Sequence, residues 1–370
     1  MRTYNTKTFT AAGLLTAAVV FLASGSALAQ QPAATPPAFL PLPPASVSTV
    51  PSNGDVNPYG VAFVSRHVQN TGVLQPGDIL VSNFNNNQNL QGTGTTIIRV
   101  TEKGQTSTFF QGSAGLGLTA ALRVVQRGFV FVGNMPTTDG TSNTVQPGSL
   151  LILDNNGKLL VNFSDTNFFN GPWGMAVNDL VDGVQVFISN VLDGTVVRLD
   201  IGFPPFGSGV QVWRAVRIAS GYKHRTDPAA LVLGPSGLSY DDANDILYVA
   251  SSFDNAVYAI PSAGAATSAN GTGTMVYQDN THLHGPLDLV LLPSGNLIVA
   301  NSDGSNADPN QPSELVEFTT AGRFVAQYSV DPNNGGAFGI GSQRLGESAL
   351  RFAAVDDNQN KLTMWTQPLQ

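Results

Sequence analysis

The sequence predicts an all-β protein, a six-bladed β-propeller of four-stranded antiparallel blades. Two observations lead to this fold class. A unit of three short apolar runs recurs along residues 46–370, with roughly 50 to 63 residues between copies, which is in the range of propeller blades. Outside the first 29 residues, no stretch of any length has the apolar periodicity of a helix. One unit cannot bury both faces of its sheet, so the copies must pack against one another.

The clearest copy spans Gly234 to Pro261 and opens with a Pro-x-Gly motif. Its three apolar runs are Leu238–Tyr240, Ile246–Ala250 and Ala256–Ile260, separated by DDAND and SSFDN. Val, Ile and Tyr favour extended backbone, whereas Asp, Asn and Ser are typical of tight turns. Each copy therefore predicts strands joined by hairpins.

The other copies repeat this order. The first strand of each copy contains one anchor position, occupied by Gly60, Thr119, Gly174, Gly237, Asp288 and Gly339. Second strands are expected at 79–83, 129–134, 186–190, 247–251, 297–301 and 351–355. Third strands are expected at 96–100, 149–153, 195–199, 256–260, 314–318 and 361–365, and fourth strands in five copies at 107–110, 159–163, 210–218, 274–277 and 323–328.

The sixth copy ends without a fourth strand. The segment that contains Ser46–Val50, just before the first copy, resembles the segment that precedes the last one. We therefore expect Ser46–Val50 to be the outer strand of the sixth blade, so that an N-terminal strand closes the ring. Closure of this kind removes the exposed edge of an unfinished blade.

The N-terminus predicts export. Arg2 and Lys7 precede the apolar stretch Ala11–Ala23, and an A-x-A pattern stands before Gln30. These features are those of a cleaved signal peptide, here residues 1–29, with a periplasmic or extracellular destination. Residues 30–44 form a Pro-rich linker, and residues 45–370 the propeller domain. No second apolar stretch of this kind follows, so no membrane span is expected.

Composition excludes some partners. The 370 residues carry a net charge of -8 and no cluster of Lys and Arg, which argues against nucleic acid. The chain has no cysteine, so disulfides cannot contribute to its stability.

The combination of Pro-x-Gly, a strand such as LYVAS, an Asp or Asn turn and a strand such as NAVYAI resembles the NHL-repeat propellers and the SMP-30/gluconolactonase group. The resemblance implies a six-bladed ring whose ligand face carries the starts of the first strands and the ends of the second strands. It implies no single activity, because different sites occur on this fold. Relatives usually have aspartate where these second strands end, but this chain has mainly asparagine.

On that face we expect two sets of ligand-binding residues. Aromatic residues at the openings could stack on a ligand or plug the channel as core packing: Tyr59, Trp173 and Phe338. Amides at the second-strand ends could bind a polar ligand or cap the strands through loop contacts: Asn83, Asn134, Asn190 and Asn301.

A metal site is a further hypothesis. His282 and His284 would face the same side if their segment is extended, and His224 is expected on the same face. Asp288 occupies the anchor position at the axis, where most copies have a small residue. It could be an inner carboxylate of the site, or a structural residue whose carboxylate bonds to backbone amides. These four residues could hold calcium or zinc, although the lactonase ligand pattern is broken at Ser236 and Leu287.

The sequence therefore favours an exported, monomeric binding or scaffold module. Its partner would be a small polar or glycan-like molecule, or a protein, held on the central-channel face. The alternative is a metal-dependent hydrolase or lyase, with its site at the channel mouth. Motifs of nucleophilic serine chemistry are absent, and whether the protein is an enzyme stays open.

Overall fold

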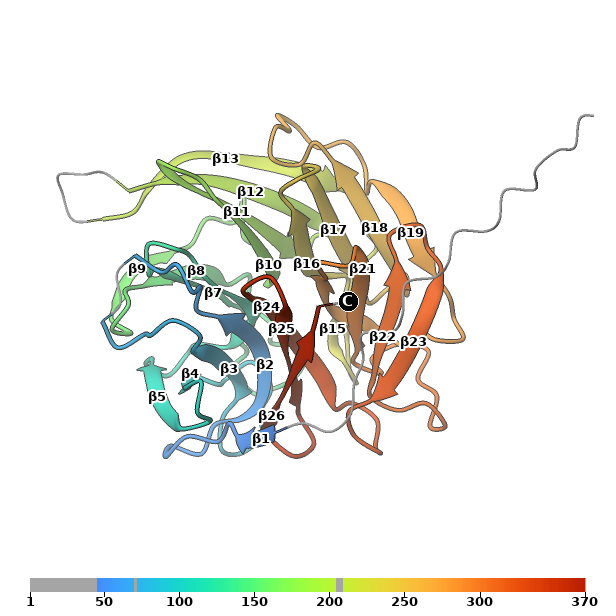
Figure 1. Ribbon diagram of the computed structural model, residues 1–370, viewed down its shortest axis with the longest axis horizontal. Coiled ribbons are helices and arrows are strands. Elements are labelled where there is room, and N and C mark those ends of the chain that lie inside the picture. Colours follow the sequence, from blue (N-terminus) through green and yellow to red (C-terminus); the bar gives the residue numbers. More distant parts are fainter. Residues whose placement is uncertain (1–44, 70–71, 204–208, 370) are drawn as a thin grey trace, which may run out of the picture. The chain divides into compact units, whose positions relative to one another are not determined.

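The computed structural model describes residues 45–69, 72–203 and 209–369. Within these ranges, six four-stranded antiparallel sheets surround one axis, which confirms the predicted six-bladed β-propeller (Figure 1). The same ranges contain no helix that is long and apolar enough to cross a membrane. The predicted signal peptide, 1–29, and linker, 30–44, lie outside the described residues and stay predictions.

Five blades are continuous in sequence, and each runs from the axis outwards. Blade 1 is β2 (Val56–Phe63), β3 (Ile79–Asn85), β4 (Thr96–Val100) and β5 (Thr106–Gln111). Blade 2 is β6 (Leu118–Val124), β7 (Val130–Asn134), β8 (Ser149–Leu153) and β9 (Leu159–Phe163). Blade 3 is β10 (Pro172–Asp179), β11 (Gly183–Asn190), β12 (Thr195–Gly202) and β13 (Gln211–Ser220). Blade 4 is β16 (Pro235–Asp241), β17 (Ile246–Ser251), β18 (Ala256–Pro261) and β19 (Thr274–Gln278). Blade 5 is β20 (Pro286–Leu291), β21 (Asn296–Asn301), β22 (Glu314–Thr319) and β23 (Phe324–Ser329).

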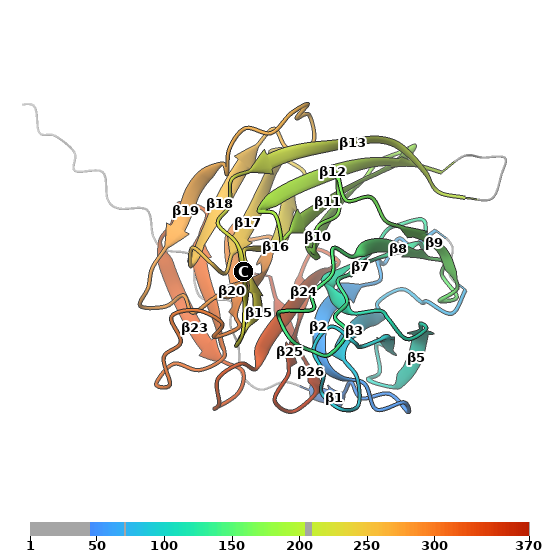
Figure 2. The same cartoon turned by 180° about the vertical axis from the view of Figure 1, so that it is seen from behind.

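The sixth blade joins two distant parts of the chain. Its strands are β24 (Ala337–Leu345), β25 (Ala349–Asp356), β26 (Lys361–Pro368) and, at the outer edge, β1 (Ala45–Ser48). β1 lies beside β26 in both views, and Val47 pairs with Leu362 (Figures 1 and 2). Thr49, just after β1, donates its N–H to the Asn360 carbonyl at 2.9 Å. The predicted ring closure is confirmed, although the strand begins one residue and ends two residues earlier than expected.

The anchor positions of the repeat are where the inner strands meet. The pairing of every first strand shifts register at or next to its anchor, which marks a β-bulge or irregularity. A Cβ atom on Gly174 would lie 2.1 Å from the Ser236 carbonyl oxygen, and one on Gly339 would lie 1.7 Å from the Tyr59 carbonyl oxygen. Glycine recurs here because the backbone of the next blade occupies that space.

Buried side chains link neighbouring blades at the same level. Hydroxyl groups donate to carbonyl oxygens of the next inner strand: Ser82 to Thr119 (2.9 Å), Thr119 to Pro172 (2.7 Å), Ser189 to Ser236 (2.5 Å) and Ser236 to Pro286 (2.8 Å). Between blades 5 and 6 the link is a carboxylate, because Asp288 Oδ2 accepts from the Ile340 N–H at 2.9 Å.

One element was not predicted. Between blades 3 and 4 the chain forms a hairpin, β14 (Arg225–Asp227) and β15 (Leu231–Leu233). Leu231 and Val232 are buried and belong to the same apolar cluster as the aromatic residues at the axis. The hairpin therefore covers part of the channel.

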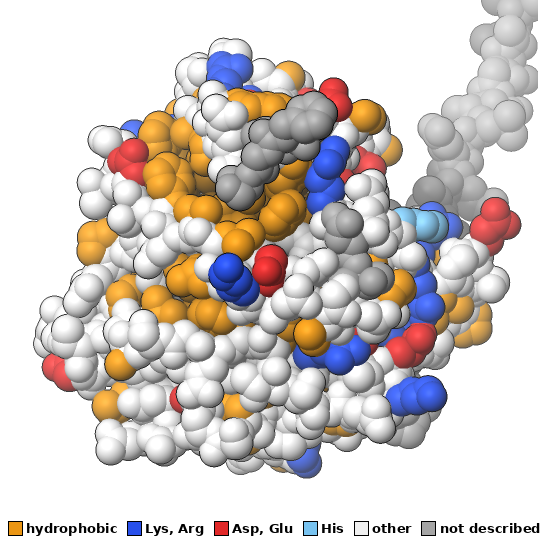
Figure 3. Space-filling view, turned by 90° about the vertical axis from the view of Figure 1, so that its left-hand side faces the viewer, with side chains coloured by type: hydrophobic (Ala, Val, Ile, Leu, Met, Phe, Trp, Pro, Cys, Tyr) orange, Lys and Arg blue, Asp and Glu red, His pale blue; other side chains and the backbone are white. Residues whose placement is uncertain are grey.

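Hydrophobic side chains are exposed on the outer strands of blades 2 and 3, on the side of the ring seen in Figure 3. Leu159 and Leu160 on β9 are 40% and 41% exposed, and Trp213 on β13 is 56% exposed. Trp213 packs over the backbone of Gly183 and Gly202, so part of its ring still shields the sheet.

Candidate functional site

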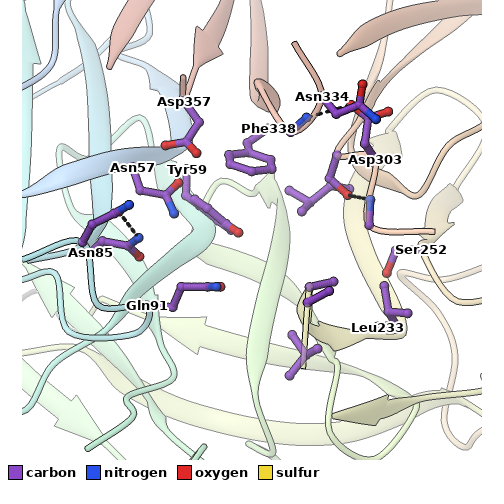
Figure 4. Close-up of a pocket in the computed structure, with 18 residues that line it drawn as sticks. Asn57, Tyr59, Asn85, Gln91, Leu233, Ser252, Asp303, Asn334, Phe338 and Asp357 are labelled. Carbon is purple, nitrogen blue, oxygen red and sulfur yellow. Dashed lines mark hydrogen bonds between the residues drawn. The ribbon is translucent and has the colours of Figure 1, made fainter. Parts of the chain in front are cut away.

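A pocket of about 360 Å³ opens on the face where the first strands begin and the second strands end. Its polar wall contains amides and two carboxyls: Asn57, Asn85, Asn89, Gln91, Asn334, Asp303 and Asp357. Its apolar wall contains Tyr59, Leu287, Phe338 and four residues of the β14–β15 hairpin: Ala229, Ala230, Val232 and Leu233. Figure 4 shows Tyr59 and Phe338 side by side, with Asp357 and Asp303 on opposite sides of the pocket.

The apolar floor is the top of a buried aromatic cluster. The Tyr59 ring lies 4.6 Å from that of Phe338, 4.8 Å from that of Phe84 and 5.6 Å from that of Trp173, between ring centroids. Trp173 is only 2% exposed and does not line the pocket. The three predicted aromatics therefore meet, as expected from their repeat positions, and together plug the channel. Tyr59 and Phe338 also form the pocket floor.

The two carboxyls lie in surroundings that disfavour their charge. Burial, with a smaller contribution from Asp356, raises the pKa of Asp357 to about 7. Burial also raises the pKa of Asp303 above its usual value, although its Oδ2 accepts from the N–H groups of Ser313 (2.9 Å) and Gly335 (2.8 Å). Carboxyls with perturbed pKa values that face one pocket are typical of functional sites.

Three lining residues other than glycine have a left-handed backbone. Asn57, Asn89 and Asp303 have φ values of 61°, 58° and 56°. Asn and Asp tolerate this conformation better than other residues, yet it still has an energetic cost and occurs often at functional sites. At Asn57 it is held in place because the Asn57 N–H donates to Asn360 Oδ1 at 2.8 Å.

The four predicted amides at the second-strand ends lie outside the pocket lining. Each is buried and bonded to a neighbouring segment. The Nδ2 group of Asn83 donates to Thr49 O, that of Asn134 to Ser149 Oγ, that of Asn190 to Phe168 O, and that of Asn301 to His282 O. These are the contacts of residues that cap strand ends and tie down loops.

The four residues proposed as metal ligands are not gathered at one point. His224 is exposed, and the His282 ring stacks on Phe324 with 3.9 Å between centroids. His284 is buried, and its Nδ1 lies 2.5 Å from the Asn306 carbonyl oxygen. In the described ranges no three His, Cys, Asp or Glu side chains are placed to hold a metal ion. The segment with His282 and His284 is not extended, because residues 280–282 form a turn, so the condition under which the two rings would face one side is not met.

Asp288 lies deeper in the channel and outside the pocket lining. Its Oδ1 accepts a hydrogen bond from the backbone N–H of Leu289 at 2.8 Å, and its Oδ2 accepts one from the backbone N–H of Ile340. Burial raises its pKa, and the opposite charge of Arg123 acts against that shift. Arg123 lines a second pocket of about 220 Å³, formed by the far ends of the six inner strands, and donates to the Leu122 carbonyl at 2.7 Å.

A buried polar cluster lies beside the pocket at the start of β22. Glu314 is 1% exposed, and its Oε2 accepts from Asn301 Nδ2 at 3.2 Å. Its other oxygen and His284 Nε2 are buried without a hydrogen-bond partner. Burial raises the pKa of Glu314 to about 7, and the charges of His284 and Asp303 contribute in opposite directions.

The Glu314 pKa predicts how stability changes with pH. A carboxyl whose pKa is higher in the folded state than in the unfolded state stabilises the fold while protonated, so stability falls as pH rises from about 4.5 to about 7. We expect Glu314→Gln to raise the free energy of unfolding at pH 8 by about 2 kcal/mol and to weaken its pH dependence. Urea unfolding at pH 5 and pH 8 measures this. The exposed Glu347→Gln is the control, and equal curves for the two variants would contradict the prediction.

Sequence reasoning missed the polar wall of the pocket, although one signal was present. Equivalent positions near the ends of the second strands are occupied by Asn83, Asn134, Asn190, Ser251, Asn301 and Asp356. The residues that follow them are Phe84, Met135, Val191, Ser252, Ser302 and Asp357. Asp357 is the only charged residue at that position, and it lines the pocket together with Ser252 and Ser302. No comparable signal marks the β14–β15 hairpin.

No protein-family profile matches the sequence, and no curated protein is significantly similar to it. Solved structures match the fold. A gluconolactonase from Xanthomonas campestris has a TM-score of 0.50 and 14% identity over 88% of this chain and 90% of its own. An α-L-arabinanase from Penicillium chrysogenum, solved with arabinobiose, has a TM-score of 0.52 and 11% identity over 88% and 99%.

A DUF4623 family protein from Bacteroides eggerthii has a TM-score of 0.52 and 10% identity, over 89% of this chain and 76% of its own. Identities this low show a shared fold and nothing finer. At that level, the resemblance to SMP-30/gluconolactonase-like propellers is confirmed. The chain is a six-bladed propeller with a plugged channel and a pocket on one face.

Proposed function

We propose that the protein binds a small polar, glycan-like ligand in the pocket above Tyr59 and Phe338. The observation that supports this most directly is the combination of an aromatic floor with a wall of amides. Aromatic rings pack on the apolar face of a sugar, and amides both donate to and accept from its hydroxyls. The volume of about 360 Å³ is in the range of small-molecule sites. The arabinanase of the same fold was solved with a disaccharide, arabinobiose.

Phe338→Leu tests this site. The substitution removes the ring and leaves an apolar side chain, so we expect about tenfold weaker binding with a small loss of stability. Calorimetry with arabinobiose and a panel of monosaccharides measures the affinity. The control is Phe352→Leu, a buried ring in the same blade that does not line the pocket. Equal affinities for Phe338→Leu and the unsubstituted protein would move the site elsewhere.

We also propose export through residues 1–29, on the sequence features alone. Mass spectrometry of the protein recovered outside the cytoplasm tests this proposal. A mature chain that begins at Gln30 supports it, and an intact N-terminus contradicts it.

A hydrolase is the second candidate, and the observation that favours it is the pair of carboxyls across the pocket. An acid with a pKa near 7 suits general acid–base chemistry at neutral pH. Assays on neutral lactones and glycosides, with Asp357→Asn as the variant, test it. Turnover that Asp357→Asn leaves unchanged would rule out this assignment. The proposed metal has no fitting set of ligands among the described residues, so no step is assigned to it.

A further inference from the structure

The lining of the pocket contains carboxyl groups but no cationic side chain, and the positive partner of Asp303 is His284, which lies outside the lining. The lining residues include two carboxyls, Asp303 and Asp357, and no Lys, Arg or His. The protein as a whole has a net charge of -8. An anionic ligand would therefore be repelled, whereas a cation would be attracted.

Several oxygen atoms of the wall need a hydrogen-bond donor. Asn57 Oδ1, Asn85 Oδ1 and Asp303 Oδ1 are buried and have no hydrogen-bond partner. Asn57 and Asn85 are 6% and 2% exposed, so bulk water does not reach these side chains freely. A buried acceptor without a donor destabilises the protein by about 1–3 kcal/mol, unless a ligand or ordered water supplies the donor.

Local contacts fix the direction of these groups. Asn85 Nδ2 donates to Asn89 Oδ1 at 2.7 Å, which leaves Asn85 Oδ1 as the free atom of that amide. The two backbone N–H groups on Asp303 Oδ2 hold its carboxyl in place. Three oxygen atoms of lining residues therefore remain as acceptors without a donor: Asn57 Oδ1, Asn85 Oδ1 and Asp303 Oδ1. Figure 4 shows Asn57 and Asp357 together on one side of the Tyr59 and Phe338 rings.

We propose that the ligand carries a positively charged amine, as an amino sugar or a small aromatic amine does, and that its ammonium group binds between Asp357 and the amide oxygens. This inference rests on the proposed function. An ammonium group has three donors and no acceptor, which matches the unpaired oxygens. The faces of the Tyr59 and Phe338 rings add cation–π attraction.

Matched ligand series test the charge preference. One series is glucosamine, glucose and glucuronate, and the other is tyramine, 4-(2-hydroxyethyl)phenol and 4-hydroxyphenylacetate. In any series that binds, we expect the amine to bind about tenfold more tightly than the neutral member, and the acid most weakly. A neutral or acidic member that binds as tightly as the amine would overturn the inference.

The carboxyl responsible is tested by substitution and pH. Asp357 is adjacent to Asp356 and near Tyr59, and Asp303 is the other charged group on the pocket wall. Tyramine, whose ammonium group stays charged over this range, should bind about fivefold more tightly at pH 8 than at pH 6 as Asp357 ionises. Asp357→Asn should remove this rise and reduce the amine preference to about twofold. The exposed Asp182→Asn is the control, and a preference that survives in Asp357→Asn contradicts the assignment.

The outcomes separate the two proposals. Binding of a neutral sugar that is weakened by Phe338→Leu, without preference for the amine, would keep the proposed function and remove the inference. Absence of binding in both series would count against both. Calcium that binds and displaces the amine would show that the oxygens form a cation site of another kind, and would overturn the inference.

Discussion

A chain that begins at Pro51 is expected to be about 5 kcal/mol less stable than one that begins at Ala45. The truncation removes β1, whose four residues pair with β26, and it exposes the apolar surface under Val47. It also removes the Thr49 carbonyl, which is the acceptor for the buried Asn83 amide at 3.0 Å. Each lost hydrogen bond contributes about 1 kcal/mol, and the lost apolar burial about 1.5 kcal/mol or more. Chemical unfolding of the two chains measures the difference.

Point variants keep this prediction falsifiable if the truncated chain does not fold. Val47 is partly buried against the apolar cluster of the axis, whereas Val50 is 44% exposed. Val47→Asp should lower the melting temperature by several degrees, and Val50→Asp should leave it nearly unchanged. Equal melting temperatures for the truncated and longer chains would mean that β1 does not hold the ring closed.

Asp288→Ala is expected to lower the free energy of unfolding by about 3 kcal/mol. The substitution leaves the buried N–H of Ile340 without its acceptor and removes the bond to the Leu289 N–H. It also removes the negative charge that favours the charged form of Arg123 in the channel. Removing one member of a buried polar and charged set is among the most destabilising single changes.

Two comparisons identify the cause. Asp182→Ala, on the surface, should change stability by less than about 0.5 kcal/mol. Asp288→Asn keeps the volume and one acceptor oxygen, so its loss should lie between that of the control and that of Asp288→Ala. Full stability of Asp288→Ala, measured by urea unfolding, would show that Asp288 is not a structural link between blades 5 and 6.

The fold could be predicted because the sequence repeats the unit that forms one blade six times. Each Pro-x-Gly opening marks a bulged inner strand, and each Asp or Asn turn marks a hairpin, so one interpretation of the unit places all the blades. The role of Ser46–Val50 followed from the missing strand of the sixth copy. The aromatics Tyr59, Trp173 and Phe338 were found for the same reason, since they occupy one repeat position.

The site could be predicted only in part, because its specific residues break the repeat. Asp303 and Asn57 owe their placement to left-handed turns, and the β14–β15 hairpin belongs to no copy. Four amides do follow the repeat, and their hydrogen bonds to neighbouring segments stabilise the blades: Asn83, Asn134, Asn190 and Asn301. Residues at repeat positions maintain the ring and supply the aromatic floor, whereas most of the polar wall comes from residues peculiar to one blade or loop.

The pairing of β1 with β26 also determines when the native state can form during synthesis. More than 300 residues separate Ser48 from its partner Lys361, so β1 leaves the ribosome long before its partner strand β26 has been synthesised. Contacts of such long sequence separation form slowly, and an unpaired strand meanwhile offers a free edge to other chains. The nascent chain therefore depends on this strand staying unpaired until the last blade has been made.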